Sequence, residues 1–403
     1  MRVSDPAFKD WLATTRRQMG ARSDLVTRPL VHIQTDGTAD AMQKDLLSHG
    51  IANGIGDWCA MRVATVGHSP DSFLHTASES FSDYLLQARL NTVPNGVSAH
   101  VSLTQRDPAL SRWTVSAQIQ NMTRDPLEDT ALFQLINKVA DRTIADLAPA
   151  HRDTETSRFL TAGTLGAVRS IFRNASGDLE IATRQLQTNF EMQREGIYLA
   201  WLAYVTTLEI AERNAQDLQS LSDRARACCA QALELDPYGS MTLALFSYVK
   251  SFVLKDMPAG YDLATRAIES NRANPLAWIF RGATHFFQGD GDRAMKDTRF
   301  GRRISGEGPY AYVIETFCCA AATCAGRYDE ALALAERAAK MAPSYKAPLR
   351  YIVAINAARG DIEALRLAIR RLRVIEPDFT IDSLRERKYP VPGMRAAGLV
   401  DPD

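Results

Sequence analysis

The chain has 403 residues, enough for two domains with separate hydrophobic cores. Hydrophobic residues make up 46% and charged residues 23%, which is typical of soluble globular proteins and argues against general disorder. Basic and acidic residues both number 47, so the formal net charge is zero. A neutral chain argues against a dedicated nucleic-acid binder, because such proteins carry excess positive charge for the phosphates.

Targeting signals and reactive cysteines are not evident in the sequence. The N-terminal residues lack the apolar segment of a secretory signal, and no stretch reaches the ~18 apolar residues that span a bilayer. We therefore expect a cytoplasmic protein that contacts no membrane. The cysteines form no CxxC pair and no zinc-like group, so we interpret them as buried reduced thiols and expect no metal and no other cofactor. They are Cys59, Cys228, Cys229, Cys318, Cys319 and Cys324.

The first half of the chain has the pattern of an α/β domain, which we place at residues 28–150 after an N-terminal helix or linker at 1–27. Its expected elements, in chain order, are a strand at 30–34, an amphipathic helix at 39–58, a strand at 61–66, a short helix, and strands around 86–90, 97–103 and 113–119. The last three strands alternate strictly between apolar and polar residues. Alternation of this kind predicts a sheet with one buried face and one polar face.

A final helix of this domain begins with a capping box. Asp125 is the cap, Pro126 the first helical residue, and Glu128 lies three residues after the cap. The apolar stripe of the helix consists of Leu132, Ile136, Val139 and Leu147. The sequence therefore predicts a small mixed sheet with helices.

The second half of the chain is periodic, and we place helical repeats at residues 155–380 and a capping helix with a tail at 381–403. The prolines that close the repeats are Pro237, Pro275, Pro309, Pro343 and Pro377, at steps of 38, 34, 34 and 34 residues. We attribute the longer first step to an extra segment at 254–260. Residues 159–192 and 198–237 read as two degenerate helical hairpins that precede the regular ones.

Each period also contains a turn with glycine. Gly289, Gly326 and Gly360 occupy these turns, where glycine can adopt the left-handed conformation that ends a helix. Asp290 and Asp361 follow two of them and can cap the next helix. Helix–turn–helix units of this length pack on their neighbours and form an elongated superhelix.

These residues resemble the tetratricopeptide repeat family, clearly so over residues 238–377. Four signature positions are matched in one repeat by Trp278, Gly282, Gly289 and Ala294, and three in the next by Ala331, Ala338 and Pro343. The resemblance implies a concave groove lined by the first helix of each repeat, which suits an apolar peptide or another part of the same protein. The groove residues would be Ile279, Ala283, Phe286, Thr316, Ala320, Thr323, Arg350, Ala354 and Ala357. The alternative is that most of these side chains pack internally.

The order of elements before the repeats resembles a TolB-amino-terminal-like domain. Such domains precede these repeats in class III adenylate cyclases and in winged-helix activators of the ToxR-like and SARP-like kinds. The resemblance rests on residues 50–55, 61–64, 83–87 and 101–105, on Trp113, and on the closing residues 394–399. Asn53 stands where that family has an acidic residue. Residues 5–12 with Arg16-Arg17 look like the linker after the DNA-binding region of SARP-like regulators, or else form an amphipathic helix on the body.

Motifs for catalysis are missing from the sequence, which contains no P-loop, GxGxxG, GxSxG, HExxH or EF-hand pattern. Two basic stripes can be recognised at helical spacing. The first contains Lys296, Arg299, Arg302 and Arg303, and the second contains Arg366, Arg370 and Arg373. They are suited to an acidic partner or a nucleic-acid backbone, and the alternative is a solvated outer face.

We conclude from the sequence that the protein is a non-enzymatic, protein-interaction module of a bacterial, transcriptional regulatory system. Its expected partner is a protein or peptide, such as a DNA-binding regulator or a transcription component, without direct nucleic-acid binding. A homodimer is compatible with the repeats. The alternatives are a small-ligand sensor with a pocket between the α/β domain and the repeats, an enzyme whose site is assembled from dispersed residues, and a direct nucleic-acid binder.

Overall fold

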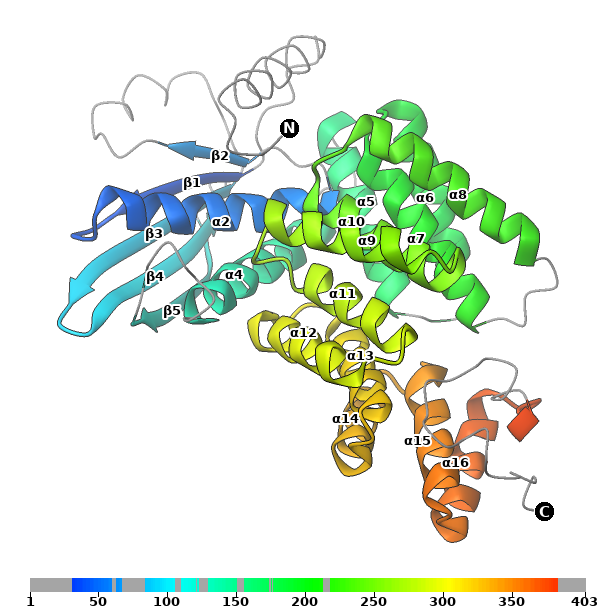
Figure 1. Ribbon diagram of the computed structural model, residues 1–403. Coiled ribbons are helices and arrows are strands. Elements are labelled where there is room, and N and C mark those ends of the chain that lie inside the picture. Colours follow the sequence, from blue (N-terminus) through cyan, green and yellow to red (C-terminus); the bar gives the residue numbers. More distant parts are fainter. Residues whose placement is uncertain are drawn as a thin grey trace.

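Figure 1 shows the computed structural model, with a small α/β domain beside an array of helical hairpins. The structure describes residues 31–59, 63–66, 84–105, 110–120, 122, 130–150, 156–173, 175, 177–212 and 218–382. Several predictions made from the sequence lie outside these ranges. They are the N-terminal helix or linker at 1–27, the short helix before the third strand, the capping box at 125–128, and all but the first two residues of the capping segment at 381–403.

The α/β domain contains a mixed sheet of five strands in the order β2-β1-β3-β4-β5. The strands are β1 (Val31–Asp36), β2 (Val63–Val66), β3 (Tyr84–Val93), β4 (Gly96–Gln105) and β5 (Leu110–Ile119). β1 pairs in parallel with both β2 and β3, while β3, β4 and β5 form an antiparallel meander. The β3–β4 turn requires Gly96, whose φ is +126° and whose added Cβ would lie 2.1 Å from the Ile119 carbonyl oxygen.

Two helices, α2 (Ala41–Cys59) and α4 (Thr130–Ala150), pack on the sheet and on each other. The alternation in the strands buries one row of apolar residues under them, and the facing row is polar and more exposed. At the helix crossing, a Cβ at Gly50 would lie 2.4 Å from the Ile136 side chain, so glycine permits this close approach. The predicted stripe of α4 is buried, including Ile136, Val139 and Leu147.

The remaining helices form hairpins that stack along the chain, as predicted. They are α5 (Thr156–Arg173), α6 (Asp178–Met192), α7 (Gly196–Glu212), α8 (Leu218–Leu235), α9 (Ser240–Tyr248), α10 (Met257–Ser270), α11 (Pro275–Phe287), α12 (Gly291–Ile304), α13 (Ala311–Cys324), α14 (Tyr328–Met341), α15 (Lys346–Arg359) and α16 (Ile362–Ile375). The first helices of successive hairpins contact one another, so α7, α9, α11, α13 and α15 form an inner row. The predicted fold class is confirmed.

The repeat turns have the predicted geometry. Gly289, Gly326 and Gly360 have φ values of 85°, 72° and 70°, in the left-handed region that glycine adopts without strain. The Asp290 carboxylate accepts a hydrogen bond of 3.0 Å from the Arg293 backbone N–H and caps α12. Glycine and aspartate therefore end one helix and begin the next, as the sequence pattern indicated.

The explanation for the longer first step is wrong. α9, α11, α13 and α15 begin at Ser240, Pro275, Ala311 and Lys346, so the helices themselves repeat every 35 or 36 residues. The 38-residue step arises because Pro237 precedes α9, whereas Pro275 is the first residue of α11. α9 continues as a π-helical turn, η1 (Val249–Val253), before the chain reaches α10.

Candidate partner-binding surface

The residues assigned to the concave groove lie inside the stack. Each of them is exposed by 5% or less: Ile279, Ala283, Phe286, Thr316, Ala320, Thr323, Arg350, Ala354 and Ala357. Their helices belong to the inner row, where the flanking first helices and the second helices of the hairpins both pack against them. A partner cannot reach side chains that are covered in this way, so the assignment of these residues as groove lining is corrected.

The buried side chain of Arg350 links α15, at the C-terminal end of the inner row, to two other parts of the chain. Its guanidinium donates hydrogen bonds of 2.8 and 2.7 Å to the two carboxylate oxygens of Glu376. It also donates one of 2.9 Å to the backbone carbonyl of Ala211, at the end of α7. α7 thus reaches α15 across the array, and the only charge predicted in the groove is neutralised within the protein.

The first basic stripe, on α12, is neutralised in part by the following hairpin. Arg299 donates to both carboxylate oxygens of Glu330 on α14, at 2.9 and 2.8 Å. Arg302 forms an ion pair with the buried carboxylate of Glu315 on α13. Lys296 lies exposed on the same helix. Half of this stripe therefore joins repeats to each other.

Arg303 completes this stripe and is exposed. Its backbone carbonyl accepts a hydrogen bond of 2.8 Å from the Gln134 side chain of α4. This bond joins α12 to the α/β domain. The side chain of Arg303 takes no part in that bond and is exposed to solvent. This agrees with the alternative of a solvated outer face.

The second basic stripe, on α16, remains largely exposed. Arg373 donates a hydrogen bond of 3.3 Å to the backbone carbonyl of Phe379. Arg366 and Arg370 are exposed, and no ion pair or hydrogen bond joins their side chains to any residue that the structure describes. Their neighbour Arg371, which was not singled out from the sequence, pairs with Glu336 on α14 at 2.6 Å. The free cations of α16 therefore point away from the array.

A partly exposed aromatic cluster lies at the C-terminal ends of α9 and α11, near the π-helical turn. The ring of Tyr248 stacks on Phe252 with centroids 5.4 Å apart and on Phe287 at 6.5 Å. Lys255 lies above the rings of Phe252 and Phe287, with its Nζ at 4.9 and 5.8 Å from their centroids. All three rings keep some exposure to solvent.

The sequence reasoning missed this cluster because it did not extend the groove back to α9. A signal was present in the spacing of Tyr248 and Phe252, four residues apart, with Lys255 three residues later. Aromatic side chains at a surface supply large contact area at a small entropic cost and are frequent energetic anchors of protein interfaces. This cluster is the candidate site on the inner row.

The junction between the α/β domain and the repeats is filled by aromatic rings. Trp58 of α2 stacks on Trp201 of α7 with centroids 5.6 Å apart and on Tyr310 at 5.1 Å. The ring of Phe172 packs edge-on against Trp58, with ring centroids 6.4 Å apart. The Trp201 indole N–H also donates to the Trp58 backbone carbonyl. Large rings packed in this way favour a fixed arrangement of the two parts.

Polar side chains of α4 secure the same junction. The Nδ2 of Asn137 donates hydrogen bonds of 2.8 and 2.7 Å to the backbone carbonyls of Ala273 and Ile304. One turn later, both carboxyl oxygens of Asp141 lie 3.0 Å from the donating hydroxyl of Tyr310. Burial raises the pKa of Asp141 to about 7, and the hydrogen bond from Tyr310 opposes this shift.

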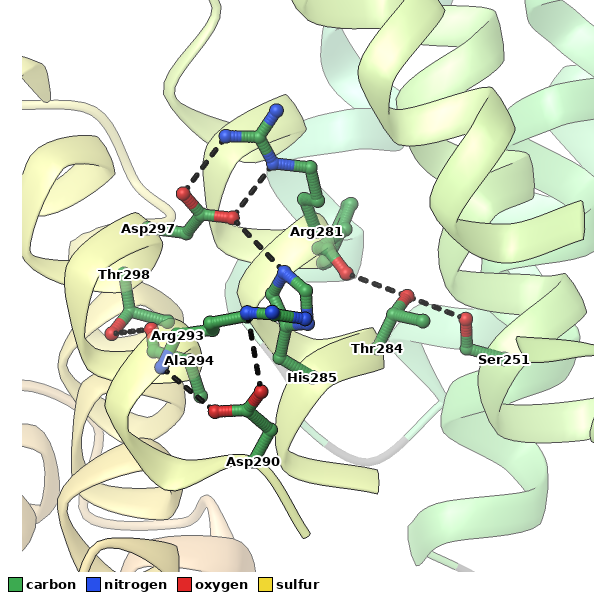
Figure 2. A network of polar contacts seen from close by, with 10 residues as sticks. Ser251, Arg281, Thr284, His285, Asp290, Arg293, Ala294, Asp297 and Thr298 are labelled. Atoms are coloured by element: carbon green, nitrogen blue, oxygen red, sulfur yellow. Dashed lines mark hydrogen bonds and ion pairs between the residues drawn. The ribbon is translucent and has the colours of Figure 1, made fainter. Parts of the chain in front are cut away.

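A further polar network connects α11 and α12, as Figure 2 shows. Arg281 donates to both carboxylate oxygens of Asp297, at 2.7 and 2.8 Å. The Nε2 of His285 lies 3.7 Å from the same carboxylate, and its buried Nδ1 has no hydrogen-bond partner in the described part of the chain. Burial lowers the pKa of His285, although Asp297 acts in the opposite direction. The imidazole is therefore neutral near pH 7.

This network offers little to catalysis. The separation of 3.7 Å between His285 and Asp297 exceeds hydrogen-bond length, so the carboxylate does not orient the ring as it would for a general base. The hydroxyls of Ser251 and Thr284, also drawn in Figure 2, bond to each other at 2.7 Å. Among described residues, no group of three or more His, Cys, Asp and Glu is placed to hold a metal ion.

The adjacent thiols of Cys318 and Cys319 are buried and poorly reactive. All six cysteines lie in the part of the chain that the structure describes, and none forms a disulfide. Burial raises the pKa of both Cys318 and Cys319 to about 12, so these thiols stay protonated at neutral pH. Within the ranges given above, no helix is long and apolar enough to cross a bilayer.

Comparisons with known proteins return repeat folds and no family. No protein-family model matches the sequence, and no curated protein matches it. A thermophilic tetratricopeptide protein of Thermus thermophilus is 16% identical, with 47% of this chain and 97% of that chain covered and a TM-score of 0.37. A tetratricopeptide repeat protein of Parabacteroides merdae is 14% identical over 64% of this chain and 91% of that chain, with a TM-score of 0.39.

A third solved structure, of the APC/C hetero-tetramer Cut9–Hcn1, is 12% identical. Here 66% of this chain and 52% of that chain are covered, and the TM-score is 0.45. Identities and scores this low carry no information about function. The function therefore has to be inferred from the residues of this chain.

Proposed function

We propose that this protein is a non-enzymatic protein-interaction module that binds a protein or peptide partner through its repeats. The observation that carries this proposal is the partly exposed cluster in which Tyr248 stacks on Phe252 and Phe287, with Lys255 above the latter two rings. Such a cluster suits an apolar or aromatic anchor of the partner. This site replaces the groove that the sequence alone suggested.

The proposal also covers the system in which the protein acts and the kind of partner that it binds. We infer that the protein acts in a cytoplasmic bacterial regulatory system and that its partner is a DNA-binding regulator or another transcription component. This inference rests on the resemblance of the N-terminal half to TolB-amino-terminal-like domains, carried by residues 50–55 and 101–105 among others. The rings of Trp58, Trp201 and Tyr310 hold that domain against the repeats, so both parts would act as one body.

The test compares partner capture by two forms of the full chain. The wild-type protein and the variant Phe252→Ser with Phe287→Ser are used as bait in the native cytoplasm, and the captured proteins are quantified by mass spectrometry. Capture of one defined partner by the wild-type protein, lost in the variant, supports the proposal. Equal capture by both forms, or none by either, contradicts it.

A control variant guards against a general effect of surface changes. Leu110→Ser alters an exposed apolar residue of β5, in the α/β domain away from the cluster. It should capture the same partner as the wild-type protein. Thermal unfolding of all three forms establishes that each is folded before capture is compared.

A further inference from the structure

The helices α12 and α16, each the second helix of its hairpin, share a register that is set by their aspartate caps. Arg299 lies nine residues after Asp290, the cap of α12, and Arg370 lies nine residues after Asp361, the cap of α16. Arg302 and Arg373, each 12 residues after the cap, are again equivalent, whereas Arg371 has no arginine counterpart on α12. α12 and α16 thus present the same pair of arginines to whatever lies on their outer side.

On α12 the structure shows what this arrangement binds. Arg299 donates to the Glu330 carboxylate from Nε at 3.3 Å and from Nη2 at 2.8 Å, and Glu330 belongs to α14, the second helix of the following hairpin. The arginine therefore pairs with an acidic side chain on a helix of the next hairpin. Paired donors of this kind fit a carboxylate with defined geometry.

On α16 the equivalent arginine has no such neighbour among the described residues. Arg366 and Arg370, one turn apart, are both exposed. Between and beyond them lie the apolar side chains of Leu367, 53% exposed, and Val374, 79% exposed. Exposed apolar residues flanked by cations along one helix face form an amphipathic surface whose charge complements an acidic partner.

We propose that the outer face of α16 binds an amphipathic helix of a partner protein that carries acidic residues along its edge, with arginine–carboxylate pairs like that between Arg299 of α12 and Glu330 of α14. This rests on the proposed function as an interaction module, but it uses a surface distinct from the aromatic cluster. A second copy of this chain fits poorly, because antiparallel pairing of two α16 helices would set Arg366 against Arg370 of the other copy. The partner is therefore a different, acidic helix.

The test uses the full chain and a defined probe. The probe is a fluorescent, 18-residue helical peptide with leucines on one face and glutamates along both edges, and binding is followed by fluorescence anisotropy. The variant Arg366→Glu with Arg370→Glu should bind it at least about tenfold more weakly than the wild-type protein, because attraction becomes repulsion. Binding to the wild-type protein should also weaken between low and high salt.

The matched control makes the same change of charge on α12. Lys296→Glu with Arg303→Glu reverses two exposed cations there, and this variant should bind the peptide like the wild-type protein. A peptide with lysine in place of glutamate should not bind. Absence of binding to the wild-type chain, or equal loss in both double variants, overturns the proposal.

The outcome is independent of the proposed site on the inner row. The variant with serine at positions 252 and 287 should keep its affinity for the acidic peptide. If partner capture does not depend on the aromatic cluster but the peptide binds α16, the proposed function fails at its site and the present proposal stands. If the peptide binds nowhere on α16 but capture depends on the cluster, the reverse holds.

Discussion

Replacement of Tyr310 by phenylalanine tests how the two parts of the protein are joined. The phenolic hydroxyl donates to both carboxyl oxygens of Asp141 at 3.0 Å, from the segment before α13 to α4. The variant keeps a ring that can stack on Trp58 and removes only the donor. Loss of a hydrogen bond to a buried carboxyl costs about 1 kcal/mol when that carboxyl is neutral and about 2 to 3 kcal/mol when it is charged.

The cost of Tyr310→Phe should depend on pH. The pKa of Asp141 is raised from 3.8 to about 7 in the folded protein, so between these values the folded state holds a proton that the unfolded state has released. This group therefore favours folding most at low pH, and its contribution is lost as the pH rises through 7. Without the hydroxyl, which favours the carboxylate, the folded pKa rises further. The variant should lose more stability at pH 8 than at pH 5.

The assay is urea unfolding at pH 5 and pH 8, followed by tryptophan fluorescence, since Trp58 and Trp201 lie at the junction. The free energy of unfolding is compared between the wild-type protein and Tyr310→Phe. Asp141→Asn serves as a reference, because its amide cannot titrate and its stability should vary less with pH over this interval. An equal loss at both pH values, or no loss at all, would refute the reasoning.

Three further predictions concern the repeats. Arg350→Ala removes a buried guanidinium that pairs with Glu376 and donates to the Ala211 carbonyl, and it should lower the free energy of unfolding by about 3 to 5 kcal/mol, as measured by urea titration. Gly360→Ala should lower the free energy of unfolding by about 1 kcal/mol through backbone strain alone. Gly282→Ala should lower it by about 1 to 3 kcal/mol through overpacking, because the new Cβ would lie 2.6 Å from a side chain of α12. Both are measured by thermal unfolding, and no change in either variant would contradict these predictions. Cys318 and Cys319 should resist a thiol reagent at pH 8 in the native protein and react on unfolding in urea, and rapid native labelling would show that they are accessible.

The local pattern of the repeats could be predicted because it depends on single residues. A glycine at the end of a helix followed by aspartate, as at Gly289-Asp290 and Gly360-Asp361, specifies a turn and a cap without reference to the rest of the fold. The strict alternation in β4 likewise specified its buried row. These features depend on neighbours within a few positions, which the sequence displays directly.

The candidate site could not be predicted in the same way, because it depends on long-range packing. Nothing near Arg350 in the sequence indicates that Glu376 and the carbonyl of Ala211 would enclose it. Similarly, Arg299 and Arg370 look alike in the sequence, yet only Arg299 meets a carboxylate from another helix among the described residues. Exposure, and with it the capacity to bind a partner, is decided by which helices lie beside each other.

Site-specific photo-crosslinking tests the central claim most directly. A photoreactive phenylalanine analogue replaces Phe252 in the full chain, or replaces Leu110 of β5 as the control, and the protein is irradiated in its native cytoplasm. The account predicts one defined protein or peptide crosslinked from position 252 and not from position 110. The absence of any specific crosslink at position 252, or the same products from both positions, would contradict a partner-binding role for the aromatic cluster.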